Sequence, residues 1–213
     1  MERKAFSISL EKNPSISMKV IPGHFTTSSA HLTHYFDVSA LKSNAMVARD
    51  VAQEFAIPYL SSTLVETIVC MERTEVIGAF LAQELLQGGV SAVQGSGEIN
   101  VVSPISNSLG NLSFQSSTLK LITNRHVILL VASISSGRTL DGALDCMAYY
   151  GAKIAGISAL FMAGYDAQEQ QINALFTSAD IPDYRLFSAR KCELCQAGQK
   201  LDALISSEGY TKI

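Results

Sequence analysis

The clearest pattern of apolar and polar positions lies between residues 126 and 161. His126 to Ala132 is a run of strand length, apolar after its first residue, which is typical of a strand buried on both faces of a parallel sheet. A small polar loop follows, and a second apolar run extends from Ile154 to Phe161. Between them, apolar residues recur at helical spacing: Leu140, Ala143, Leu144, Met147 and Ala148. The pattern predicts a strand, a helix and a parallel strand, with the helix ending on a left-handed Gly151.

A second unit of the same kind precedes this one. Leu64 to Val69 is predicted to be a strand, and Glu75 to Leu86 a helix that ends at Gly88-Gly89. Four apolar residues are predicted to face inward from this helix: Val76, Ala79, Phe80 and Leu86. Another helix is predicted from Ala45 to Phe55. Because strands and helices alternate, we expect an α/β fold with a central, mostly parallel sheet and helices on both faces.

The stretch from Thr74 to Leu119 contains no Lys or Arg. Two short alternating runs, Glu98 to Val102 and Asn111 to Phe114, flank the turn sequence Asn107-Ser108-Leu109-Gly110. This arrangement predicts a β-hairpin in which the two runs pair with each other.

Composition narrows the class of protein. The chain has 213 residues and 22.9 kDa, which suits a single domain. Apolar residues make up 47% and charged residues 16%, so the chain can form a core. The formal net charge of −3 argues against electrostatic binding of nucleic acid, which needs a basic face. No apolar run approaches the ~20 residues of a membrane span and no apolar signal region follows Met1, so we expect a cytoplasmic protein without membrane contact.

The loop between the first apolar run and the following helix is a candidate phosphate site, made of Ser135, Ser136, Gly137, Arg138 and Thr139. Small hydroxyl side chains, a glycine and the positive end of a helix suit an anion, and open α/β sheets bind ligands at the carboxyl ends of their strands. The alternative is an ordinary turn with Thr139 as the N-cap residue. A loop that wraps a phosphate would give Gly137 a positive φ.

Residues 128 to 139 resemble the phosphoribosyl diphosphate (PRPP) motif of the type I phosphoribosyltransferases. In that motif, four apolar and two acidic residues precede a Thr/Ser-x-Gly-x-Thr loop. The helix ending in Gly151-Ala152 is similar to the one that follows the motif in the family. Phe25 to Asp37 resembles an N-terminal segment of the orotate branch, and the tail from Cys192 through Cys195 to Leu201 is similar to the end of some of its members. These motifs follow the family's order along nearly the whole chain.

The resemblance implies one phosphoribosyltransferase-like domain over residues 1–213, with a core from about 41 to 179 and a small hood from about 1–40 and 180–213. It also implies a homodimer that transfers phosphoribose from PRPP to orotate in pyrimidine nucleotide synthesis, with Mg²⁺ as cofactor. The 5′-phosphate would lie on residues 135–139. The residues implied to face the pyrophosphate or the base are Ser28, Ser29, His31 and Arg73.

Three features depart from the family pattern. Ser29-Ala30 stands where the orotate enzymes have Gly followed by a cation. Val131 and Ala132 occupy the positions of the two acidic residues, and neither side chain can accept a hydrogen bond from a ribose hydroxyl. The segment aligned with the family's mobile loop has no basic residue before Lys120, although cations stabilise a leaving pyrophosphate. These departures keep a second function open, a non-catalytic regulator on the same fold that binds a nucleotide or a sugar phosphate.

Potential metal ligands fall into two separate groups. His24, His31 and His34 lie in the N-terminal segment, where histidines of polar loops are usually solvated, and Cys192 and Cys195 lie near the C-terminus. The cysteine pair is half of a possible zinc site, which needs two more ligands, so we predict no protein-bound metal ion. The scattered carboxylates are predicted to be solvated or ion-paired: Asp37, Glu66, Glu72 and Glu75.

Overall fold

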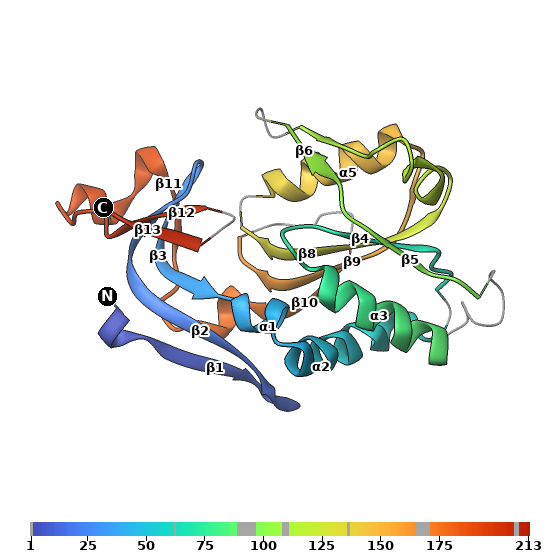
Figure 1. The fold of residues 1–213 in the computed structure, drawn as a ribbon. Coiled ribbons are helices and arrows are strands. Elements are labelled where there is room, and N and C mark those ends of the chain that lie inside the picture. Colours follow the sequence, from blue (N-terminus) through green and yellow to red (C-terminus); the bar gives the residue numbers. More distant parts are fainter. Residues whose placement is uncertain are drawn as a thin grey trace.

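The computed structural model describes residues 2–61, 63–88, 97–107, 111–135, 137–164, 171–206 and 209–213. They form a parallel sheet flanked by helices and a second, largely antiparallel sheet, which we call the hood. Figure 1 shows the two side by side, with the parallel sheet on the right and the hood on the left. The α/β architecture with a mostly parallel central sheet is confirmed.

The central strand of the parallel sheet is β8 (His126–Ile134), which forms from the apolar run that begins at His126. The five strands follow in space in the order β10 (Ile172–Thr177), β9 (Lys153–Met162), β8, β4 (Thr67–Cys70) and β5 (Asn100–Val102). Each neighbouring pair is parallel. The carboxyl ends of all five strands therefore lie at one edge of the sheet.

Helices cover both faces of this sheet because successive side chains of a strand point to opposite sides. Alternate residues of β8 from Ile128 to Ala132 pack in one core cluster with α2 (Ala45–Ala56) and α3 (Glu75–Gly88). The intervening residues, from Val127 to Val131, pack in a second cluster with α5 (Arg138–Tyr149). Figure 1 shows α2 and α3 on one side of the sheet and α5 on the other.

The ends of these helices follow from local sequence. Asn44 caps α2, because its Oδ1 accepts hydrogen bonds from the N–H groups of Met46 and Val47. Helix α5 begins directly after Gly137 and is followed by Gly151, which has a φ of 72°. The predicted left-handed glycine at the end of this helix is confirmed.

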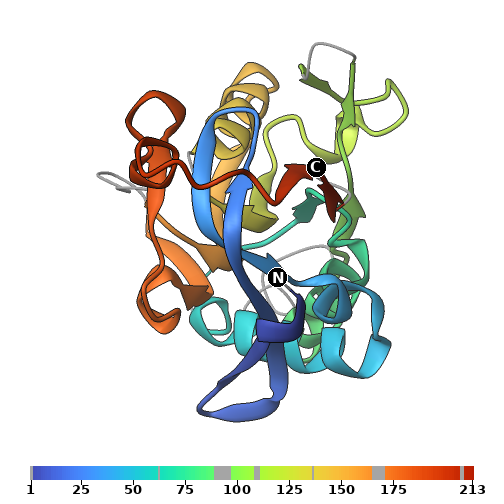
Figure 2. The ribbon, with the colours of Figure 1, turned by 90° about the vertical axis from the view of Figure 1, so that its left-hand side faces the viewer.

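The hood joins the two ends of the chain. Its strands are β1 (Phe6–Leu10), β2 (Asn13–Thr26), β3 (Ala30–Asp37), β11 (Leu186–Ser188), β12 (Ala203–Ser206) and β13 (Gly209–Lys212). β11 pairs with β3 and β12 pairs with β2, so C-terminal strands complete a sheet that N-terminal strands begin. Figure 2 turns the hood toward the viewer, with the blue β2 beside orange and red C-terminal segments.

Short elements connect these parts: α1 (Ser39–Ser43), α6 (Glu193–Gln196), β6 (Ile105–Ser106), β7 (Leu112–Ser113), and the 3₁₀ turns η1 (Glu2–Lys4), η2 (Ile57–Tyr59), η3 (Leu119–Leu121), η4 (Ser178–Asp180) and η5 (Ala189–Lys191). Within the described part of the chain, no helix combines the length and the apolar character needed to cross a membrane.

The hairpin predicted from residues 98–102 and 111–114 is wrong in its pairing. Asn100–Val102 forms β5 and pairs in parallel with β4, whereas the hairpin partner of β7 is β6. Val102 is buried against the face of the sheet that α5 covers, and this burial favours the non-local pairing. Of the predicted turn, residues 108–110 lie outside the described residues.

The inward face predicted for α3 is wrong in part: of its four residues, Phe80 packs against a core cluster, but the centre of the buried face lies elsewhere. Ile77, Leu81 and Leu85 are buried, whereas Val76 is 41% exposed. Apolar residues lie all around this helix, so their spacing does not define a single face. The strand before it begins at Thr67 rather than at Leu64.

Candidate functional site

A cavity of about 1050 Å³ lies at the carboxyl ends of β4 and β8, where the hood meets the parallel sheet. Four segments supply most of its wall: residues 27–29 between β2 and β3, residues between 32 and 43 on β3 and α1, residues that follow β4, and residues 132–140 from the end of β8 into α5. The C-terminal hairpin of β12 and β13 adds Leu204, Ile205, Ser206 and Gly209. Because ligands of open α/β sheets bind at the carboxyl ends of the strands, this cavity is the candidate functional site.

The N-terminus of α5 opens into the cavity. Ser135, Gly137, Arg138 and Thr139 all line it, and Ser136 lies outside the described residues. Gly137 is the N-cap residue with a φ of 79°, so the expected positive φ is confirmed. The alternative in which Thr139 caps the helix is wrong, because the helix begins at Arg138. Gly137 has no side chain to cap the helix, which leaves the positive helix end suited to an anion.

Three of the residues implied to face the pyrophosphate or the base line the cavity: Ser28, Ser29 and Arg73. The first two lie in the turn between β2 and β3, which Thr27 shapes. Its Oγ1 accepts hydrogen bonds from the N–H groups of Ser29 (3.2 Å) and Ala30 (3.0 Å). The turn therefore holds two serine residues at the cavity wall.

His31 lies elsewhere. Its Nδ1 is 3.2 Å from Nε2 of His24 and 3.3 Å from Sγ of Cys195, and it is not among the cavity-lining residues. The next residue on β3, Leu32, does line the cavity. Since neighbouring side chains on a strand point to opposite faces, His31 points to the other face of the hood. The structure thus separates His31 from Ser28, Ser29 and Arg73.

The two positions that carry acidic residues in the family motif differ in their surroundings. Ala132 lines the cavity, where a carboxylate could meet a ligand. Val131 is 1% exposed and packs in the apolar cluster beneath α5. An ionised side chain at Val131 would be buried among apolar groups, so the valine there suits the packing of this core.

Glu72, which the sequence predicted to be solvated or ion-paired, instead lines the cavity and binds backbone groups. Its Oε2 accepts hydrogen bonds from the N–H groups of Ala132 (3.0 Å) and Ser133 (3.1 Å), so the carboxylate lies beside the altered motif. Burial raises the pKa of Glu72, and these two hydrogen bonds and Lys42 oppose the rise. Glu72 and Arg73 have φ values of 53° and 65°, a backbone conformation that costs non-glycine residues energy and often marks ligand sites.

Among the residues that the structure describes, the cations that line the cavity are Lys42, Arg73 and Arg138. Lys42 was not identified from the sequence; its Nζ donates a hydrogen bond to the carbonyl of Glu72 (2.8 Å). Lys120 is not among the cavity-lining residues. It belongs to η3, and Leu121 of the same turn accepts a hydrogen bond from Thr67 at the amino end of β4. The segment from 74 to 119 contains no Lys or Arg, but segments before and after it supply cations to the cavity.

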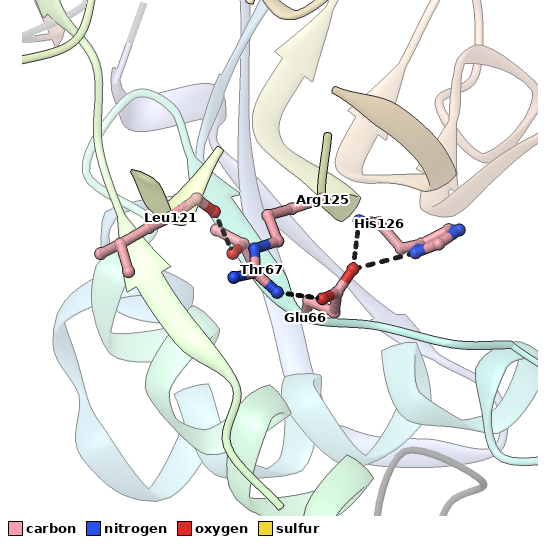
Figure 3. A network of polar contacts seen from close by, with 5 residues as sticks. All are labelled: Glu66, Thr67, Leu121, Arg125 and His126. Atoms are coloured by element: carbon pink, nitrogen blue, oxygen red, sulfur yellow. Dashed lines mark hydrogen bonds and ion pairs between the residues drawn. The ribbon is translucent and has the colours of Figure 1, made fainter. Parts of the chain in front are cut away.

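A different polar network lies at the amino ends of β4 and β8, away from the cavity (Figure 3). The carboxylate of Glu66 accepts hydrogen bonds from Nη1 of Arg125 (2.5 Å) and from the N–H (3.0 Å) of His126, whose ring Nδ1 also lies 2.9 Å from it. Burial alone would raise the pKa of Glu66, but the hydrogen bonds from His126 and Arg125 outweigh it and lower the value to about 2. The network joins the starts of two neighbouring strands.

The cavity by itself does not fit a protein-held Mg²⁺ ion. Mg²⁺ prefers carboxylate and phosphate oxygens, and the acidic side chains in the described lining are Glu72 and Glu75. Glu75 already accepts a hydrogen bond from Ser103 (2.6 Å), and the one group of three or more metal-ligating side chains among the described residues lies outside the cavity. Oxygens of a bound diphosphate would have to supply most of the ligands.

Comparison with known proteins supports the fold. A scan against protein-family models and a search of curated proteins both gave no match. Among solved structures, the UMP synthase of Leishmania donovani matches with a TM-score of 0.55 and 15% identity, over 75% of this chain and 34% of that chain. This chain therefore spans about a third of that protein.

Two further solved structures match at lower TM-scores. The adenine phosphoribosyltransferase of Leishmania donovani has a TM-score of 0.49 and 12% identity, over 71% of this chain and 73% of that chain. The orotate phosphoribosyltransferase of Mycobacterium tuberculosis, in complex with Fe(III) dicitrate, has a TM-score of 0.46 and 12% identity, over 76% and 90%. At these identities the likeness is one of fold, and the chain has the type I phosphoribosyltransferase fold.

Proposed function

We propose that the chain binds PRPP in this cavity and transfers its phosphoribosyl group to a nitrogenous base. The observation that carries the proposal is Gly137, the left-handed N-cap residue of α5, which follows the carboxyl end of β8 and lines the cavity. The partial positive charge of the helix end and the hydroxyl groups of Ser135 and Thr139 suit a 5′-phosphate. The cavity volume of about 1050 Å³ leaves room for the rest of a sugar diphosphate.

The remaining groups suit the other parts of PRPP. Glu72 binds backbone N–H groups through Oε2, which leaves Oε1 as the oxygen for a ribose hydroxyl. During transfer, the bond from C1 of the ribose to the diphosphate oxygen breaks, a bond from C1 to a ring nitrogen of the base forms, and the proton of that nitrogen passes to the departing diphosphate or to water. Negative charge then increases on the diphosphate, and Lys42, Arg73 and Arg138 are the cavity cations that would stabilise it. Mg²⁺ would enter only with the diphosphate.

Orotate is the base to test first. The sequence resemblance to the orotate branch and the similar fold of a UMP synthase both favour a pyrimidine. The competing function is a regulator that binds a nucleotide or sugar phosphate without turnover. Val131 is buried and apolar, so the single carboxylate of Glu72 stands where the family motif has two carboxylates. This loss of a ribose contact favours the regulator over the enzyme. A homodimer stays a prediction, which sedimentation velocity would test.

Calorimetric titration and an activity assay separate the two functions. Ribose 5-phosphate, orotidine monophosphate and PRPP are titrated with and without Mg²⁺, and orotate consumption is followed at saturating PRPP and Mg²⁺. An enzyme binds PRPP and consumes orotate, whereas a regulator binds a monophosphate and leaves orotate unchanged. If none of the three phosphorylated ligands binds, the proposed site is wrong.

Gly137→Val tests where the phosphate lies. A β-branched residue cannot adopt the φ of 79° without strain, so we expect ribose 5-phosphate to bind at least ~10-fold more weakly. Gly151→Val is the matched control, because Gly151 has a φ of 72° at the other end of the same helix. Both variants should lose stability, but only Gly137→Val should lose binding. Equal affinity in the two variants would show that α5 does not hold the phosphate.

A further inference from the structure

Four potential metal ligands from opposite ends of the chain converge inside the hood. His24 lies on β2 and His31 on β3, whereas Cys192 precedes α6 and Cys195 lies within it. One ligand atom from each side chain lies within 4.8 Å of every other. The sequence places the histidines and the cysteines more than 160 residues apart. The prediction of no metal site rested on the two ligands that the cysteine pair lacks, and His24 and His31 occupy those two places.

The distances between these atoms match those of a tetrahedral zinc site. Nε2 of His24 lies 3.2 Å from Nδ1 of His31, 3.4 Å from Sγ of Cys192 and 3.7 Å from Sγ of Cys195. Nδ1 of His31 lies 3.3 Å from Sγ of Cys195. Zinc bonds of about 2.3 Å to sulfur and about 2.0–2.1 Å to nitrogen place the ligand atoms of a tetrahedron about 3.3–3.8 Å apart.

A hydrogen bond on the far side of His24 prepares its ring as a ligand. Nδ1 of His24 lies 3.0 Å from the carbonyl oxygen of Gln199, so it carries the proton and donates it. In the neutral ring, the form that binds metal ions, Nε2 then carries the lone pair and faces one nitrogen and two sulfur atoms. One lone pair cannot accept hydrogen bonds from three neighbours, whereas a cation at the common centre would bind all four groups. Metal-bound histidines usually donate their other N–H to a carbonyl or a carboxylate in this way.

We propose that His24, His31, Cys192 and Cys195 bind one structural Zn²⁺ ion. Two thiolates and two imidazoles favour zinc over Mg²⁺ or Ca²⁺, which prefer oxygen ligands. Four protein ligands leave no position for water or substrate, which is typical of structural zinc and not of catalytic zinc. His24 is fully buried and Cys192 is 1% exposed, whereas Cys195 is exposed and gives the ion a route of entry.

The location of the site gives the ion a role in shaping the cavity. His24 and His31 lie on either side of the turn at residues 27–29, which lines the cavity. Cys192 and Cys195 belong to the segment that leads to β12, whose Leu204 to Ser206 also line the cavity. A zinc ion would therefore bind the turn of the N-terminal hairpin to the C-terminal segment and hold two parts of the cavity wall in place.

The test uses the full chain, purified in reducing buffer without chelator. We expect one zinc ion per chain by plasma mass spectrometry. Co²⁺ added after zinc removal should give the visible absorption of tetrahedral cobalt and a thiolate charge-transfer band. Removal of zinc should lower the melting temperature, and returned zinc should restore it. None of these measurements requires PRPP, so they succeed or fail independently of the proposed function.

Matched variants identify the ligands. Cys195→Ser and His31→Gln should weaken zinc binding at least ~10-fold against a competing chromogenic chelator. Cys146→Ser and His34→Gln are the controls, because these residues lie outside the group of four, and they should bind zinc like the unchanged chain. Cys195 is exposed, so its serine variant is the one best suited to remain folded.

Three results would overturn the proposal. The first is a reduced chain that holds no zinc and gives no thiolate-to-cobalt band. The second is a disulfide between Cys192 and Cys195 that persists in the reducing purification buffer. The third is unchanged zinc affinity in both Cys195→Ser and His31→Gln. The cobalt titration of the unchanged chain keeps the proposal testable even if a variant does not fold.

Discussion

Two glutamates lie at opposite ends of β4, and their surroundings give them opposite properties. Glu66 precedes the strand and accepts hydrogen bonds from Arg125 and His126, which lower its pKa to about 2. Glu72 follows the strand, where burial raises its pKa despite two backbone hydrogen bonds. One carboxylate stabilises the fold in its ionised form, whereas the ionised form of the other is costly.

The difference indicates what each edge of the sheet does. At the amino edge, Glu66 is paired with Arg125 and does not line the cavity. At the carboxyl edge, a partly desolvated carboxylate, a left-handed backbone at Glu72 and Arg73 and an uncapped helix end surround a cavity. A raised pKa and backbone strain are typical of ligand sites, and paired surface charges are typical of structural contacts.

The largest expected effect comes from placing a new carboxylate at this carboxyl edge. Val131→Asp should lower the free energy of unfolding by about 3–5 kcal/mol, because it buries an unpaired charge in an apolar cluster. Ala132→Asp should lower the free energy of unfolding by less, since position 132 lines the cavity and the new carboxylate could reach water. Urea denaturation of both variants at pH 7 measures the difference. Equal losses of stability in the two variants would contradict the difference in surroundings between a buried Val131 and a cavity-lining Ala132.

The next effect concerns the activity proposed for the cavity. Glu72→Gln replaces a charged acceptor for a ribose hydroxyl, which typically costs ~1.5–3 kcal/mol, so kcat/KM for phosphoribosyl transfer should fall about 10- to 100-fold. Glu66→Gln at the other end of the same strand is the control and should stay within about 2-fold. If turnover is absent, the same comparison applies to the Kd for PRPP. Similar values for both variants would remove Glu72 from the proposed ribose contact.

The smallest expected effects are changes in the free energy of unfolding, and their signs should differ between variants of the two glutamates. Glu66→Gln should lower the free energy of unfolding at pH 7 by about 1–2 kcal/mol, a value reduced from the full pKa shift because Arg125 is half exposed. Glu72→Gln should leave stability at pH 7 unchanged or higher, because the buried charge is removed while an amide oxygen still accepts the two backbone hydrogen bonds.

The pH dependence of these two differences should be opposite. The pKa of Glu66 is lowered in the folded state, so its stabilisation is present above the unfolded value of 4.5 and is lost as the pH falls toward about 2. The pKa of Glu72 is raised, so the unchanged chain loses stability relative to Glu72→Gln as the pH rises through the folded pKa of Glu72. Thermal unfolding across this range measures both. Parallel pH profiles for the two variants would contradict the comparison.

Much of the parallel sheet could be predicted from local sequence. The apolar run from His126, the helical spacing before Gly151 and the second run from Ile154 fix β8, α5 and β9, because each pattern lies within a single element. The hairpin prediction failed because strand pairing depends on distant partners: β5 pairs with β4, about 30 residues earlier in the chain. The face of α3 could not be predicted because its apolar residues surround the helix.

The backbone geometry of the candidate phosphate loop was predictable for the same reason as the strands. Gly137 lies between an apolar run and a helix, so the sequence alone indicates a left-handed residue at a helix N-terminus. Glu72 gave no such signal, because its hydrogen bonds go to backbone groups 60 residues further along the chain. Lys42 was missed for a similar reason, since its partner is a carbonyl group 30 residues away.

The sequence by itself determined the elements of the parallel sheet, the helix end suited to phosphate and, through its motifs, the fold. The tertiary structure alone decided which charged groups share the cavity and that His24 and His31 meet Cys192 and Cys195. Local patterns encode local backbone geometry, because apolar spacing and glycine act within a few residues. The cluster of His24, His31, Cys192 and Cys195 depends on the pairing of strands from both ends of the chain in the hood, and that pairing is set by burial and hydrogen bonding across the whole molecule.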